Sequence, residues 1–250
     1  LLSTLLRRRD HAARAVELVG ALAASLGASA AARLVSGVSP SIVTIAALIA
    51  LLPGLTLTLA MSELATRHLV SGTARLMSGV IVLLELALGV ALGERLARAL
   101  WTVPPVTPSP LPAGSEWVAF LLATLGMVVV CQAQRKSIGW ILLTSFVAYA
   151  ASKFGTRLLD AELGVVIGAL ALGIAANLYA RVLDRPQQVV LVPAMILLVP
   201  GSMGFRGMSS LLDRNTMNGI ETTFATFVVA LAIAAGLLIA SAVVSPRRAL

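Results

Sequence analysis

Eight apolar runs, separated by short polar connections, follow one another along the chain. An α-helix needs about 20 apolar residues to cross a bilayer, and each run approaches that length once tilt and flanking residues are included. Charged residues lie mostly between the runs, as in proteins that cross a membrane several times. The pattern predicts an all-α polytopic membrane protein with about eight transmembrane segments. The runs cover roughly residues 15–35, 41–60, 74–96, 116–130, 138–151, 163–179, 187–199 and 220–244.

One stretch of the chain occurs twice. The first copy begins at Ala47 and reads ALIALLPGLTLTLAMSELATRHLVSG, and the second begins at Ala194 and reads AMILLVPGSMGFRGMSSLLDRNTMNG. A constant offset of 147 positions aligns the copies without a gap and gives ten identities in 26 positions. Shared hydrophobicity does not explain these identities, because proline, glycine and arginine are among them. In both copies a Pro-Gly pair interrupts an apolar run, which is typical of a discontinuous helix in a transporter built from repeats.

The spacing of the copies predicts their relative direction. The first three apolar runs match the last three, so the offset is five segments, an odd number. The copies are therefore expected to cross the membrane in opposite directions, as an inverted repeat of a five-helix unit. With eight segments present, we expect the first two helices of the first unit to be absent from this sequence and to precede Leu1.

A proline-rich segment separates the two predicted repeats. Residues 102–115 read TVPPVTPSPLPAGS and contain five prolines, which excludes a helix and indicates an extended linker. Residues 1–101 then hold the last three helices of the first repeat, and residues 116–250 hold the five helices of the second.

Composition and charge agree with a membrane protein. Hydrophobic residues make up 58% of the chain and charged residues 12%, too apolar a balance for a soluble domain. The net charge of +8 lies in short loops and does not indicate nucleic-acid binding. With a cytoplasmic N-terminus, twelve basic residues fall inside and seven outside, which predicts both ends of the chain in the cytoplasm. The single cysteine, Cys131, lies in an apolar run and is expected to be a small buried hydrophobe.

The sequence resembles the threonine/serine exporter family. The resemblance rests on LLPGLTLTLAMSELATRHLVSGTARL in the first half and VPAMILLVPGSMGFRG in the second, and extends weakly over nearly the whole chain. It implies a bacterial inner-membrane carrier that exports serine and threonine using the proton gradient. It also implies ten transmembrane segments, in one chain or split between two, and a soluble N-terminal region that this sequence lacks. The alternative is a transport-complex subunit that is inactive without a partner chain or its missing N-terminal part. A homo-oligomer or a partner membrane subunit is the expected assembly.

The helix breaks offer a substrate site on chemical grounds alone. A Pro-Gly break frees backbone groups that lipid cannot satisfy, and a helix N-terminus facing the break can hold a carboxylate. Nearby hydroxyls have the right size to bond a serine or threonine side chain. The alternative is that Pro-Gly only kinks the helix and the hydroxyls bond back to the backbone. The predicted substrate-binding residues are Pro53, Gly54, Thr56, Thr58, Ser62, Pro200, Gly201 and Ser202, with Ser209 as a further hydroxyl.

Charged residues supply candidates for proton coupling. Glu85 lies ten positions beyond Arg75, hence roughly 15 Å along a helix, where an intramembrane carboxylate is a proton-relay candidate or a hydrogen-bonded structural residue. Glu63 and Asp213 are further candidates near segment ends, where they could equally be solvated.

The repeat-related pair Arg67 and Arg214 could pair with Glu63 and Asp213, bind the substrate carboxylate as gating residues, or anchor at the interface. No cofactor, metal site or enzymatic motif is predicted, because His68 has no ligand partner at useful spacing and neither GxSxG nor HExxH occurs.

Overall fold

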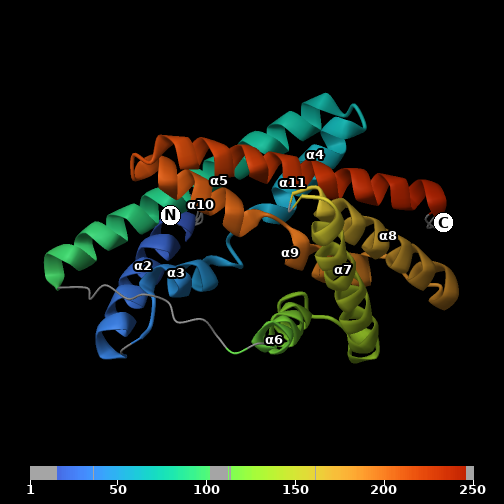
Figure 1. The fold of residues 1–250 in the computed structure, drawn as a ribbon, viewed down its shortest axis with the longest axis horizontal. Coiled ribbons are helices and arrows are strands. Elements are labelled where there is room, and N and C mark those ends of the chain that lie inside the picture. The colour runs from blue at the N-terminus through green and yellow to red at the C-terminus, as the bar shows by residue number, and fades with distance from the viewer. Residues whose placement is uncertain (1–15, 36, 102–111, 113, 161, 246–250) are drawn as a thin grey trace, which may run out of the picture. The chain divides into compact units, whose positions relative to one another are not determined.

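The computed structural model describes residues 16–35, 37–101, 112, 114–160 and 162–245, and every element in these ranges is helical (Figure 1). Most of the predicted linker 102–115 and the basic stretch at the N-terminus lie outside them. The elements are α2 (Val16–Leu34), α3 (Pro40–Leu48), α4 (Gly54–Ala65), α5 (Leu69–Leu100), α6 (Ser115–Val130), the 3-10 turn η1 (Arg135–Ser137), α7 (Ile138–Leu158), α8 (Gly164–Leu183), α9 (Gln188–Leu198), α10 (Gly201–Leu212) and α11 (Thr216–Val243).

Six helical segments in the described part of the chain are long and apolar enough to cross a membrane, which confirms a multi-pass helical protein. Eight spans are not confirmed. The second apolar run is divided at Pro53 into the short helices α3 and α4, and α6 has only 16 residues. The six segments are Val16–Leu34, Leu69–Leu100, Arg135–Leu158, Gly164–Leu183, Gln188–Leu212 and Thr216–Val243.

The helices form two compact units, each composed of segments from both sequence repeats. Unit 1 comprises the described residues within Leu1–Pro53, Met77–Pro110 and Gly201–Thr223. Unit 2 comprises those within Gly54–Leu76, Leu111–Pro200 and Phe224–Leu250.

The borders of these units repeat along the chain. The cuts after Pro53 and Leu76 recur after Pro200 and Thr223, each 147 residues later. As a result α4 belongs to unit 2, and its repeat equivalent α10 belongs to unit 1. The division into sequence halves at the linker remains a prediction about the repeat, since the units are defined by contacts.

Within unit 1, α2 crosses α5 at two glycines. A Cβ on Gly89 would lie 2.4 Å from the carbonyl oxygen of Leu18, and one on Gly93 would lie 2.8 Å from Cβ of Ser25. The Ser25 hydroxyl donates to the carbonyl of Val90 over 3.3 Å. Small residues matter here because lipid supplies no hydrophobic drive for helix association, which then depends on close packing.

Within unit 2, α8 crosses α11 in the same way. A Cβ on Gly236 would lie 2.6 Å from the carbonyl oxygen of Val166, and one on Gly173 would lie 2.5 Å from Cβ of Ala240. Gly236 lies 147 residues after Gly89 and is therefore its equivalent in the sequence repeat. The two units therefore share a glycine-mediated helix crossing of the same local design.

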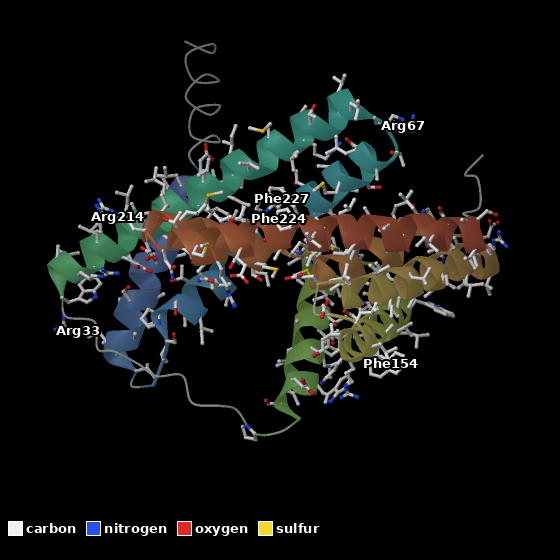
Figure 2. The ribbon with its side chains drawn as sticks, turned by 45° about the horizontal axis from the view of Figure 1, so that its top comes forward. Arg33, Arg67, Phe154, Arg214, Phe224 and Phe227 are labelled. Atoms are coloured by element: carbon white, nitrogen blue, oxygen red, sulfur yellow. The ribbon has the colours of Figure 1, made fainter. Side chains whose placement is uncertain are left out.

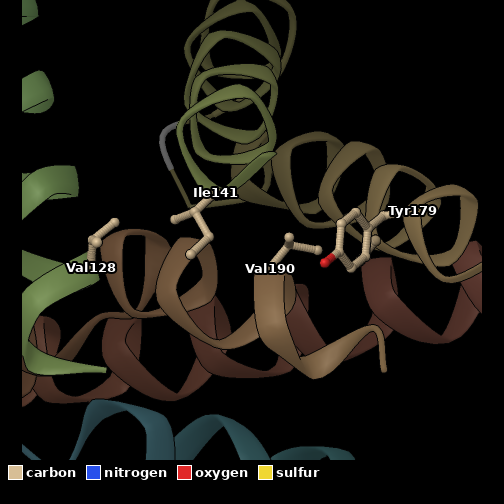
Figure 3. Close-up of a cluster of buried hydrophobic side chains, with 5 residues drawn as sticks. Val128, Ile141, Tyr179 and Val190 are labelled. Carbon is tan, nitrogen blue, oxygen red and sulfur yellow. The ribbon is translucent and has the colours of Figure 1, made fainter. Parts of the chain in front are cut away.

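Unit 2 also has a compact apolar cluster where α6, α7, α8 and α9 meet (Figure 3). Its members Ile141, Tyr179 and Val190 are at most 2% exposed. The Tyr179 ring also meets the Trp140 ring edge-on, with centroids 5.7 Å apart. This cluster fixes the ends of four helices relative to one another.

The glycine crossing generates the first testable prediction. Replacing Gly89 with alanine should lower the midpoint of thermal unfolding in detergent, because the new Cβ meets backbone and not a movable side-chain tip. Overpacking of this kind costs about 1–3 kcal/mol. Gly27→Ala in α2 is the matched control, since nothing lies within 4 Å of its Cβ position. Its expected effect is neutral or stabilising by up to about 1 kcal/mol. Equal midpoints for the two variants would contradict the crossing.

Candidate functional site

Both Pro-Gly pairs interrupt a helix in the structure. Helix α4 begins at Gly54, directly after Pro53, and α10 begins at Gly201, directly after Pro200. All four residues are buried. Proline suits the residue before a helix because it has no backbone amide to donate. The helix breaks expected at these positions are present, and each coincides with a border between the two units along the chain.

The turn that follows each short helix is also repeated. Arg67 and Arg214 have φ of 65° and 61°, in the left-handed region. The amide of His68 donates to the carbonyl of Glu63, and that of Asn215 to the carbonyl of Ser210, both over 2.9 Å. This six-to-one bond is the Schellman ending of a helix.

Both arginines are exposed at the tips of their own hairpins (Figure 2). Neither forms an ion pair within the described residues. Glu63 is instead paired with Arg75, whose Nε lies 3.0 Å from Oε1. Pairing of Glu63 with Arg67, one of the alternatives open from the sequence, is therefore not what the structure contains.

Unit 1 contains a polar cavity of about 500 Å³. Its walls come from α3, α5, α10 and the first turns of α11, so it lies wholly within this unit. A smaller void of about 30 Å³, lined in part by Glu94, Ser209 and Asp213, lies in the same unit. The cavity is lined by Ser41, Thr44, Ile45, Val90, Glu94, Ser202, Met203, Phe205, Arg206, Ser209, Ser210, Asp213, Asn218 and Thr222.

One face of α10 carries much of this polar lining. Ser202, Arg206, Ser209 and Asp213 follow one another at intervals of four, three and four residues, which places them on one side of a helix. The opposite side is buried and includes Gly204, Gly207 and Met208. Close packing on one side of α10 thus leaves a polar face on the other.

The charges of the cavity are a carboxylate on α5, a guanidinium on α10 and a carboxylate at the end of α10. Glu94 Oε2 accepts a hydrogen bond from Nη2 of Arg98 over 2.9 Å, and the carboxylate can still accept further hydrogen bonds. Thr44 donates back to the carbonyl of Pro40 over 2.8 Å. The hydroxyl oxygen of Ser209 is buried and has no hydrogen-bond partner in the described part of the chain.

The cavity lining contains only some of the residues predicted from the sequence. Ser202 and Ser209 were predicted as hydroxyls of the substrate site and Asp213 as a proton-coupling candidate, whereas Glu94 and Arg206 were not predicted. The helical spacing of 202, 206, 209 and 213 would have identified Arg206. Nothing local to Glu94 would have separated it from other charges at a segment end, because its neighbours in the cavity are distant in sequence.

At the first break, Pro53 is the last residue of its segment in unit 1, and the predicted residues that follow it lie in unit 2. Thr58 is 1% exposed, and its hydroxyl donates to the carbonyl of Gly54 over 3.1 Å. For Thr58, therefore, the hydroxyl does bond back to the backbone, although its lone pairs can still accept. Thr56 and Ser62 are half-buried on the same helix.

The lining charges are not shared by the two repeats. The positions 147 residues before Arg206 and Asp213 are Leu59 and Thr66, and the position 147 residues after Glu94 is Ser241. Ser209 does have an equivalent, Ser62. The repeat thus supplies the same backbone twice, and the charged chemistry of the cavity belongs to unit 1.

Glu85 does not line the cavity. It lies on α5 nine residues before Glu94, hence turned by about 180° around the helix axis. It is half-buried, and no hydrogen bond or ion pair involves it in the described ranges. No group of three or more potential metal ligands is found among the described residues.

Comparison with known proteins identifies the family. A model described as threonine/serine exporter, ThrE, matches residues 116–243, and one described as putative threonine/serine exporter matches residues 1–97. A threonine/serine exporter of Corynebacterium glutamicum is 26% identical over 226 residues, which is 88% of this chain and 46% of that protein.

Fungal proteins are also similar. Pheromone-regulated membrane protein 10 of Zygosaccharomyces rouxii is 29% identical over 68% of this chain and 18% of that protein. Its namesake in Candida glabrata is 24% identical over 72% of this chain and 25% of that protein. The chain thus spans between about a fifth and a half of the length of these curated relatives. No solved structure matches the chain. Since one family model alone covers more than half of the sequence, the chain belongs to the threonine/serine exporter family.

Proposed function

We propose that this chain is the membrane part of a secondary active transporter that exports serine and threonine, driven by the proton gradient. The observation that carries the proposal is the polar cavity of unit 1, placed directly after a broken helix in a member of this family. Its volume of about 500 Å³ falls in the range of small-molecule sites. The proposed location is the bacterial inner membrane, with both ends of the chain in the cytoplasm.

The cavity offers a partner for each group of a hydroxy amino acid. Gly201 and Ser202 open α10, where unpaired amides and the helix dipole favour the substrate carboxylate. Glu94 and Asp213 are acceptors for the ammonium group, and the unpartnered hydroxyl of Ser209 is suited to the substrate hydroxyl. Arg206 is a second candidate for the carboxylate.

The first break takes the equivalent role in unit 2 under this proposal. Gly54 opens α4 as Gly201 opens α10, and Thr56, Thr58 and Ser62 provide hydroxyls along the helix. With an inverted repeat, alternating access would use the two breaks in turn. Arg67 and Arg214 are proposed as gating residues because their turns are exposed and identical in backbone conformation.

Proton coupling is assigned to three carboxylates, on α4, on α5 and directly after α10. Asp213 lines the cavity, Glu85 is half-buried on α5, and Glu63 is held by Arg75. Asp213 is the candidate closest to the proposed substrate site. A transport-complex subunit that needs a partner chain or an N-terminal region is the alternative function.

Transport by the purified chain in proteoliposomes tests the function. We expect radiolabelled serine and threonine to accumulate when a pH gradient is imposed. Glu85→Gln should keep serine exchange while losing gradient-driven accumulation. Asp213→Asn, which also removes an acceptor for the substrate ammonium group, should lower both exchange and accumulation. Accumulation at the normal rate in both variants would remove these residues from coupling. If the chain alone does not transport serine, and transport begins when a partner chain or an N-terminal region is added, the subunit function is favoured.

The role of the helix breaks is tested by filling them. Gly201→Leu and Gly54→Leu should each lower the initial rate of transport about tenfold or more, since one charge-assisted hydrogen bond is worth about 1.5–3 kcal/mol. Pro53→Ala should be milder, because it leaves the space open. Gly27→Leu, at a helical glycine with open space around it, is the control for insertion and expression. Normal serine transport by both break variants would place the site elsewhere.

The inverted repeat is tested by cysteine accessibility. In a background with Cys131 replaced by alanine, cysteines at Ser71 and Asn218 should react with impermeant reagents from opposite sides, cytoplasmic and periplasmic respectively. These residues are equivalent in the repeat and both are exposed. Labelling from the same side would refute the inverted arrangement.

A further inference from the structure

A second cavity, of about 650 Å³, lies within unit 2 and takes no part in the proposed transport site. It is built where the α6–α7 and α8–α9 connections meet the first turns of α9. Its lining residues are Cys131, Gln132, Ala133, Gln134, Ser137, Arg185, Pro186, Gln188, Val189, Val192 and Pro193.

The lining combines a cationic polar part with an apolar wall. Arg185 is half-buried and has no ion-pair partner among the described residues, and no carboxylate belongs to the lining. The amides of Gln132, Gln134 and Gln188 lie in the same lining and can donate hydrogen bonds. Val189, Val192 and Pro193 continue the wall along α9.

The shape of this cavity is fixed by packing. Ala133 and Val189 line it and also pack on the apolar cluster of Val128, Ile141 and Val190 (Figure 3). The turn after α6 is held by a hydrogen bond that the backbone amide of Ala133 donates to the carbonyl of Val128 over 3.0 Å. A preformed site loses less conformational entropy on binding than one that must be ordered.

The charge around the cavity indicates an anionic ligand. Arg135 and Lys136 directly precede Ser137 in its wall. The two connections together hold three basic residues and one acidic residue, Asp184, so their net charge is positive. A guanidinium matches the oxygens of a phosphate group in a bidentate manner, and excess basic residues mark the cytoplasmic side, whose leaflet carries anionic lipids.

We propose that this cavity binds a phosphate group attached to an apolar body, as in the headgroup region of an anionic membrane lipid. The Arg185 guanidinium and the glutamine amides hold the phosphate, and Val189, Val192 and Pro193 contact the apolar part. A soluble phosphate is the other source of the same chemistry. The apolar wall favours the lipid.

Lipid-dependent stability of the purified full chain tests the proposal. We expect short-chain phosphatidylglycerol, titrated in neutral detergent, to raise the thermal unfolding midpoint more than phosphatidylcholine does, because a ligand of the native state stabilises it. Arg185→Gln should require about tenfold more phosphatidylglycerol for the same shift, the equivalent of one lost charge-assisted bond. Arg157→Gln is the matched control, an exposed arginine with the same charge change at the other end of α7.

Two further arms distinguish the sources. Val192→Phe, which fills the apolar wall, should weaken the phosphatidylglycerol response and leave any response to inorganic phosphate unchanged. If inorganic phosphate alone protects wild type and Arg157→Gln but not Arg185→Gln, the phosphate site stands with a soluble ligand. Equal phosphatidylglycerol responses in wild type and Arg185→Gln would overturn the proposal, as would no response to either probe in wild type.

Discussion

Backbone amides and carbonyls find no water in the interior of a bilayer, so a helix there is interrupted only where protein or a polar cavity satisfies the freed groups. This constraint explains how unit 1 is arranged. Helix α10 begins at the buried Gly201, buries one side that includes Gly204 and Gly207, and contributes its serines and charged residues to the lining of a cavity. The break before α10 exposes backbone groups, and the polar cavity beside α10 provides polar surroundings in the same unit.

The two repeats share this backbone solution and differ in chemistry. Helices α4 and α10 have the same length, end in the same left-handed arginine turn, and are followed by a glycine that packs on the preceding leucine. Yet Glu63 is tied to Arg75 in unit 2, whereas the equivalent positions in unit 1 are Ser210 and Thr222, which line the cavity. The two copies thus share a backbone, and the positions that form an ion pair in unit 2 contribute polar side chains to a cavity in unit 1.

The sequence predicted the features that depend on local pattern. Hydropathy predicted helices, and the Pro-Gly pairs predicted the two breaks, because both signals are written within a few neighbouring residues. Ser202, predicted for substrate binding, and Asp213, predicted for proton coupling, both line the cavity of unit 1. It did not predict the number of long spans, because the length of α5 and the shortness of α6 depend on where packing ends each helix. Glu94 escaped detection for a related reason: its cavity neighbours come from α3 and α10, and no local pattern joins these elements.

The borders of the compact units have a consequence for any version of this architecture that is divided into two polypeptides. A fragment ending in the proline-rich segment would contain α2, α3 and α5 without α10, which supplies six of the fourteen residues that line the cavity in their unit. The complementary fragment would contain α6 to α11 without α4. Neither half would own a complete set of packing partners, so the halves would have to find each other during membrane insertion. Assembly of such a pair would then depend on synthesis and insertion of both fragments together, more than on the affinity between two separately folded fragments.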